Sequence, residues 1–60
     1  MRPNEIIRIL VADGWFEAKR SGSHIHFRHE IKSGLVLVPF HAGKDLGKLA
    51  YVILKQAGLR

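Results

Sequence analysis

Three of the four histidines of this 60-residue chain lie in one segment, SGSHIHFRH, which follows two basic residues. His24 and His26 are separated by one residue, and Arg28 follows them at the same spacing. Imidazole accepts or donates a proton near neutral pH, because its unperturbed pKa is about 6.5. An exposed histidine among lysines and arginines can therefore transfer protons in phosphodiester cleavage, while the cations stabilise charge on the phosphoryl oxygens.

RNA supplies its own nucleophile for such a reaction, the 2′-hydroxyl. A base removes the hydroxyl proton, the oxygen attacks phosphorus, and an acid protonates the leaving 5′-oxygen. In this hypothesis His24 carries out one proton transfer, and Lys19, Arg20 or Arg28 supplies the positive charge. Two alternatives stay open: the histidines are ordinary surface residues, or the His-x-His pair chelates zinc with His41 converging on it.

The histidine segment has the pattern of a half-buried strand. Residues 23–28 alternate between polar and apolar side chains. In a strand, successive side chains point to opposite faces, so Ile25 and Phe27 are expected to face the core while His24 and His26 face solvent. The serine and glycine before this segment favour a tight turn.

The rest of the chain predicts the elements around this strand. Apolar residues at helical spacing predict a helix over 3–13. Residues 15–20, WFEAKR, indicate a first strand, and residues 35–39, LVLVP, indicate a third. Asp45 is expected to cap a last helix, which Gly58 ends. The predicted fold is α+β, with a three-stranded antiparallel sheet and both helices on its apolar face.

Several apolar side chains are expected to fill the core. They include Leu10 of the first helix and Leu37 of the third strand, together with the apolar residues of segment 23–28. Trp15 and Phe16 are neighbours at the start of the first strand, so one must face the core and the other must face the opposite side.

Composition limits the classes of protein and partner. Sixty residues make a single domain, 1–60, and ten Lys and Arg against five Asp and Glu give a net charge of +5. This excess favours an anionic partner, either nucleic acid or an acidic protein surface. The absence of cysteine excludes disulfides and thiolate metal sites. With no long apolar run and no signal-like segment in MRPNEIIRIL, we expect a soluble, cytoplasmic chain with no membrane partner.

Four segments together resemble one family. They are R-S-G-S-H-I-H-F at 20–27, D-G-W at 13–15, L-V-L-V-P at 35–39 and I-L-K-Q-A-G-L at 53–59. In this order and spacing they are similar to the HicA family of bacterial toxin mRNA interferases, over nearly the whole chain. The resemblance implies a double-stranded-RNA-binding-domain-like α-β-β-β-α fold, ribosome-independent mRNA cleavage without a metal or other cofactor, and inhibition by a HicB antitoxin.

The resemblance also implies a site. The family's catalytic histidine directly follows Gly-Ser, which assigns His24. The residues expected to bind RNA around it are Lys19, Arg20, Ser23, His26 and Arg28. The free chain is expected to be a monomer, and a double-stranded RNA-binding module without catalysis is the alternative function. The chain departs from the family at 45–51, D-L-G-K-L-A-Y, which lacks the usual Gly-Thr-Leu, and the carboxylate of Asp45 repels phosphate there.

Overall fold

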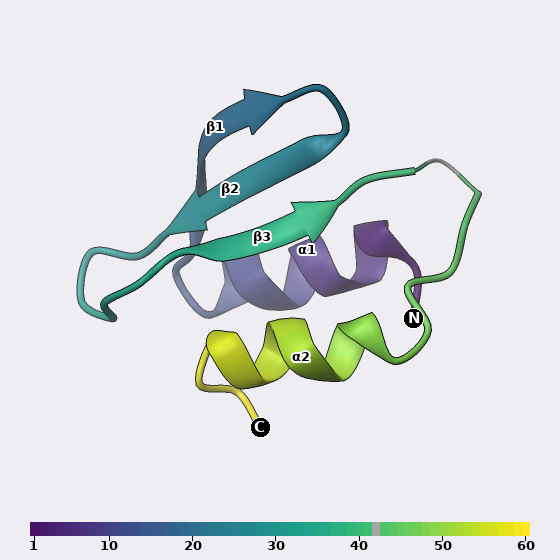
Figure 1. Cartoon of the computed structure of the whole chain (residues 1–60). Coiled ribbons are helices and arrows are strands. Elements are labelled where there is room, and N and C mark those ends of the chain that lie inside the picture. The colour runs from purple at the N-terminus through teal and green to yellow at the C-terminus, as the bar shows by residue number, and fades with distance from the viewer. Residues whose placement is uncertain (42) are drawn as a thin grey trace.

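A computed structural model describes residues 1–41 and 43–60. Its elements are, in chain order, α1 (Pro3–Ala12), β1 (Phe16–Ser21), β2 (His24–Arg28), β3 (Val36–Pro39) and α2 (Leu49–Gln56). The strands pair antiparallel in the order β1-β2-β3. Both helices lie on the same side of this sheet (Figure 1). The predicted α-β-β-β-α order and the three-stranded antiparallel sheet are confirmed.

The core lies between β2, β3 and the two helices. Alternation along the strands sends every second side chain toward the helices, and spacings of three and four residues direct one stripe of each helix back toward the sheet. The strand residues buried here are Ile25, Phe27, Val36 and Val38, and the helix residues are Ile6, Leu10, Ala50 and Ile53. By contrast, every residue of β1 is exposed, because neither helix covers that strand.

The prediction that Leu37 belongs to the core is wrong. Leu37 lies opposite His26 in the β2–β3 register, and 39% of it is exposed. Val36 and Val38 lie opposite buried residues of β2 and are themselves buried. An uninterrupted apolar run has no period-two signal, so the faces of its residues are set by pairing with the neighbouring strand.

Both helices end in a glycine turn of the Schellman type. In α1, the Trp15 N–H donates to the Leu10 carbonyl at 3.0 Å and the Gly14 N–H donates to the Val11 carbonyl at 3.0 Å. Gly14 takes a φ of 102° at this turn, in the region that favours glycine. The turn buries Trp15 to 2% exposure and leaves the next residue 48% exposed, so the expected division of the two aromatic residues is confirmed.

The prediction that Asp45 caps the last helix is wrong. The helix α2 begins at Leu49, and Lys48 is its N-cap residue, without a side-chain hydrogen bond. Asp45 instead accepts a hydrogen bond from the Gly47 N–H at 2.7 Å and pairs with the amino group of Met1 at 2.9 Å. These two interactions, the first above all, lower the pKa of Asp45. With a φ of 57°, Gly47 cannot belong to a right-handed helix, so α2 begins after it.

A polar cluster ties the end of α1 to the loop between β2 and β3 and to the end of α2. Lys32 Nζ donates to Asp13 Oδ2 at 2.5 Å and to the carbonyl of Ala57 at 3.0 Å. Trp15 Nε1 donates to the same Asp13 oxygen at 3.2 Å. One lysine therefore connects two helix ends that are distant in the sequence.

His29 completes this cluster and uses both ring nitrogens. Its Nδ1 accepts hydrogen bonds from the backbone N–H groups of Ile31 and Lys32, at 3.0 and 3.1 Å. Nε2 is therefore the nitrogen left to donate, and it lies 2.6 Å from the carbonyl oxygen of Asp13. The ring meets Trp15 edge to face, with centroids 5.2 Å apart. His29 is thus a structural residue that braces the β2–β3 loop.

We predict that Gly14→Ala destabilises the fold more than Gly34→Ala. Both glycines have positive φ, 102° and 92°, so each substitution introduces backbone strain of about 1–3 kcal/mol. A Cβ at Gly14 would also stand 2.7 Å from His29 Nε2, whereas one at Gly34 would meet no atom within 4 Å. Displacing His29 adds the loss of its part-buried hydrogen bonds, each of which contributes about 0.5–1.5 kcal/mol. Urea unfolding of both variants measures the difference, and equal losses would contradict it.

We predict that the stability of the fold falls at acid pH partly through Asp13. The hydrogen bond from Lys32 is the main cause that lowers the pKa of Asp13 below its ordinary value of 3.8. A group whose pKa is lowered by folding stabilises the native state above its unfolded pKa and loses that contribution as pH falls through its folded pKa. The melting temperature should therefore decline below about pH 4, and Asp13→Asn should reduce both the stability at neutral pH and the size of this decline. If the melting temperature of Asp13→Asn fell by the same amount at acid pH, the carboxylate of Asp13 would be excluded as a cause of the acid destabilisation.

Candidate active site

The turn before His24 fixes where β2 begins. Gly22 and Ser23 are the two residues between β1 and β2. Gly22 has a φ of 58° and Ser23 has no positive φ, which is the combination that a type II′ hairpin turn requires. A Cβ at Gly22 would meet nothing within 4 Å, so backbone conformation is the reason for glycine here. The turn makes His24 the first residue of β2, directly opposite Ser21.

The side of the sheet away from the helices carries the predicted histidines, and we call it the outer face. Residues opposite each other on neighbouring strands share a face, so pairing identifies its members. The outer face comprises Phe16, Lys19 and Ser21 of β1, His24, His26 and Arg28 of β2, and Leu37 and Pro39 of β3. His24 is exposed, His26 is half-buried and the residues between and after them are buried, so the predicted alternation is confirmed.

A β-bulge in β1 brings Lys19 to this face, and nothing in the sequence indicates it. The register on β2 shifts between Glu17 and Lys19. As a result Phe16 lies opposite Arg28 while Lys19 lies opposite His26. Without the extra residue, Phe16 and Lys19 would point to opposite sides of the strand. The bulge therefore places an aromatic ring and a cation together on the outer face.

Arg20 lies on the other side of β1 from the histidines. It is opposite the buried Ile25, and its guanidinium is 3.1 Å from the carboxylate of Glu17. The same guanidinium is 6.0 Å from the ring centroid of Phe40. Arg20 is exposed, yet its charge is shared with Glu17 and it does not point along the face that carries His24.

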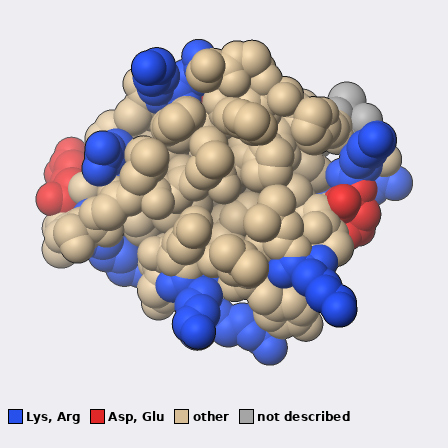
Figure 2. All heavy atoms as spheres, in the orientation of Figure 1, with Lys and Arg blue, Asp and Glu red and all other residues tan. Residues whose placement is uncertain are grey.

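Arg28 lies at the end of β2 that is far from His24. Its guanidinium donates to the carbonyl of Gly34 at 3.2 Å, which holds it against the β2–β3 loop. Of the predicted cations, Lys19 is therefore the one whose place in the pairing is nearest to the two histidines. In the view of Figure 2, lysines and arginines lie around the rim of the molecule and the centre has neither sign of charge.

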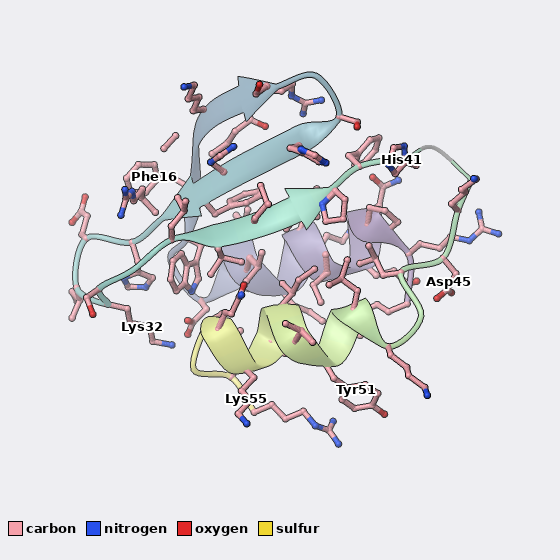
Figure 3. The ribbon with its side chains drawn as sticks, viewed as in Figure 1. Phe16, Lys32, His41, Asp45, Tyr51 and Lys55 are labelled. Carbon is pink, nitrogen blue, oxygen red and sulfur yellow. The ribbon has the colours of Figure 1, made fainter. Side chains whose placement is uncertain are left out.

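The β3–α2 connection passes beside the turn that precedes His24. The N–H of Phe40 donates to the carbonyl of Ser23 at 2.6 Å, which extends the β2–β3 pairing past the last strand residue. His41 follows and is exposed at this end of the sheet (Figure 3). The pairing therefore brings His24 and His41 to the same end of the sheet from segments far apart in the sequence.

Neither a metal cluster nor a membrane-crossing helix is present in the part of the chain that the structure describes. Among residues 1–41 and 43–60, no three His, Cys, Asp or Glu side chains are grouped so that they can hold a metal ion. The His-x-His pair thus has no third ligand among these residues. Both described helices are too short and too polar to cross a bilayer.

These features coincide with a known family. The sequence profile of the HicA toxins of bacterial toxin-antitoxin systems matches residues 3–59. The chain belongs to the HicA toxin family, so it is the toxin of a toxin-antitoxin pair and has an antitoxin as its partner. No curated protein matches the sequence.

Proposed function

We propose that this toxin is an endoribonuclease that cleaves mRNA in the cytoplasm without ribosomes and without a metal ion, and that His24 is its general acid or base. The observation that carries the proposal is the exposed imidazole of His24 on the outer face, at the first position after the hairpin turn. Membership of the HicA family supports a toxin function for this face.

The predicted residues around His24 form two groups: those placed to contact RNA and those whose charge attracts it from a distance. Lys19 and His26 are cross-strand neighbours on the outer face, two positions further along the hairpin from the Ser21–His24 pair. They are placed to contact a phosphodiester backbone that runs along the strands. Ser23 contributes from the turn, where its carbonyl is already bonded to Phe40. Of the other predicted cations, Arg20 lies on the opposite side of β1 and Arg28 is held on the Gly34 carbonyl at the far end of β2, so both act through long-range attraction of RNA.

The reaction follows from the chemistry of RNA. A neutral imidazole takes the 2′-hydroxyl proton, and the 2′-oxygen forms a bond to phosphorus. The bond from phosphorus to the 5′-oxygen breaks, and a protonated acid supplies the proton that this oxygen needs. His24 carries out one of these transfers, and the products are a 2′,3′-cyclic phosphate and a 5′-hydroxyl. The lysine on the outer face stabilises the negative charge of the phosphoryl oxygens.

An HicB-type antitoxin that covers the outer face would neutralise the toxin by excluding RNA. Binding to the folded state alone also raises its stability by mass action, which matters for a chain of 60 residues with a small core. One surface would then serve both RNA and the antitoxin.

We predict that His24→Ala strongly slows RNA cleavage by the purified chain in the presence of excess chelator. Loss of one general acid or base lowers the rate by about 10²–10⁴-fold. Because His24 is exposed, the fold should be retained, which the melting temperature checks. Lys55→Ala is the matched control, since this exposed cation lies on α2 on the other side of the sheet (Figure 3).

The same assay separates catalysis from binding alone. If RNA stays intact after incubation with the unsubstituted chain, and the chain binds duplex RNA in a salt-dependent way, its function is that of a double-stranded RNA-binding module and not that of a nuclease. Cleavage at an undiminished rate by His24→Ala would overturn the role of this residue. Cleavage lost on addition of chelator would overturn the metal-free reaction.

A further inference from the structure

We propose that His41 is the second proton-transfer group of the same reaction, acting with His24 on opposite sides of one phosphodiester. This inference rests on the proposed nuclease function and adds a catalytic residue to it. In-line cleavage needs both a base near the 2′-oxygen and an acid near the 5′-oxygen, so a single histidine leaves one of the two roles unfilled.

The pairing of β2 with β3 sets the separation of the two histidines. His24 is opposite Pro39, and the bond from Phe40 N–H to the Ser23 carbonyl continues this pairing by one step. His41 is thus two residues beyond the partner of His24. With about 3.3 Å per residue along a strand and about 4.8 Å between strands, their Cα atoms are about 8 Å apart. Two imidazoles at this separation can each reach one of the two oxygens that bond to the same phosphorus.

His41 lies just past the end of the third strand, at the end of the sheet where His24 begins β2. Val36 and Val38 point into the core and Leu37 points away from it. Phe40 keeps the inward direction and packs against the core cluster. His41 follows Phe40 and is exposed, so its imidazole is accessible to RNA at the same end of the sheet as His24 (Figure 3).

Two basic side chains line the hollows that His41 borders. His41 borders two shallow hollows of about 160 and 100 Å³, between the start of α1 and the β3–α2 connection. Lys44 lines the first and Arg2 lines the second. Asp45 also lines the first, but its carboxylate is engaged by the Met1 amino group and the Gly47 N–H. The net positive charge beside His41 therefore favours the binding of an RNA phosphate group there.

The other two histidines do not fit this role. Both ring nitrogens of His29 are engaged within the polar cluster, and the residue lies beyond the opposite end of β2. His26 is half-buried between Lys19 and Leu37, in the middle of the sheet. Apart from His24 itself, His41 is the only described histidine that is both exposed and located at the His24 end of the sheet.

The experiment compares the rate of RNA cleavage across pH for the unsubstituted chain, His24→Ala and His41→Ala. With one imidazole acting neutral and the other protonated, the unsubstituted profile is a bell. Each variant should lose about 10²-fold or more in rate and should lose one limb of the bell, the two variants losing opposite limbs. The charged groups beside His41 are Arg2, Lys44, Asp45 and the Met1 amine. Beside His24 they are Lys19 on the outer face and, on the other side of β1, Arg20 with its partner Glu17.

A second substrate makes the assignment independent of pH. RNA with sulfur in place of the 5′-oxygen has a leaving group that needs no protonation, so it should restore cleavage by the variant that lacks the acid and leave the other variant slow. His41→Gln repeats the His41 measurement with a polar side chain, and Lys55→Ala provides the unaffected control. Melting temperatures confirm that each variant is folded.

The outcomes separate this inference from the function on which it rests. Cleavage that depends on His24 but is unchanged in His41→Ala and His41→Gln overturns the inference and leaves the nuclease in place. A slower His41→Ala that keeps both limbs of the bell overturns it as well, since a structural role moves the rate without moving the profile. Absence of cleavage by the unsubstituted chain overturns both proposals together.

Discussion

The burial of Ile25 and Phe27 is the constraint on which the rest of the structure depends. These two side chains of β2 are 1% and 2% exposed, and they face both helices across the core. Burying one such side chain contributes about 1.5–3 kcal/mol, so a slip of one residue would lose both contributions and would place His24 and His26 in an apolar interior. The burial of Ile25 and Phe27 therefore keeps His24 and His26 on the solvent side of the sheet.

The two ends of the sheet have different physical characters. At one end, the polar cluster of Asp13, Trp15, His29 and Lys32 connects both helix ends to the β2–β3 loop through short hydrogen bonds. At the other end, a hairpin turn and the β3–α2 connection meet through one backbone hydrogen bond and present exposed imidazoles. One end of this small sheet is therefore tied to both helix ends by side-chain hydrogen bonds, while the other end presents exposed histidines.

Sequence patterns predicted the order of the elements and the direction of the histidines, because both depend on local periodicity. They did not predict the outward position of Leu37, since an apolar run has no alternation to show which side is buried. The bulge that brings Lys19 beside His26 and the delay of α2 to Leu49 are consequences of pairing and of backbone conformation at Gly47. The bracing role of His29 depends on contacts with residues that only the fold brings together.

The central claim is that RNA binds along the outer face at the His24 end of the sheet. Its most direct test is the change in backbone amide NMR shifts when the ¹⁵N-labelled chain binds an RNA whose 2′-hydroxyls are methylated and which therefore cannot be cleaved. We expect the amide shifts of α2 to stay unchanged and the largest shift changes to fall on Lys19, Ser23, His24, His26 and His41. Changes confined to Leu49–Gln56 would contradict it.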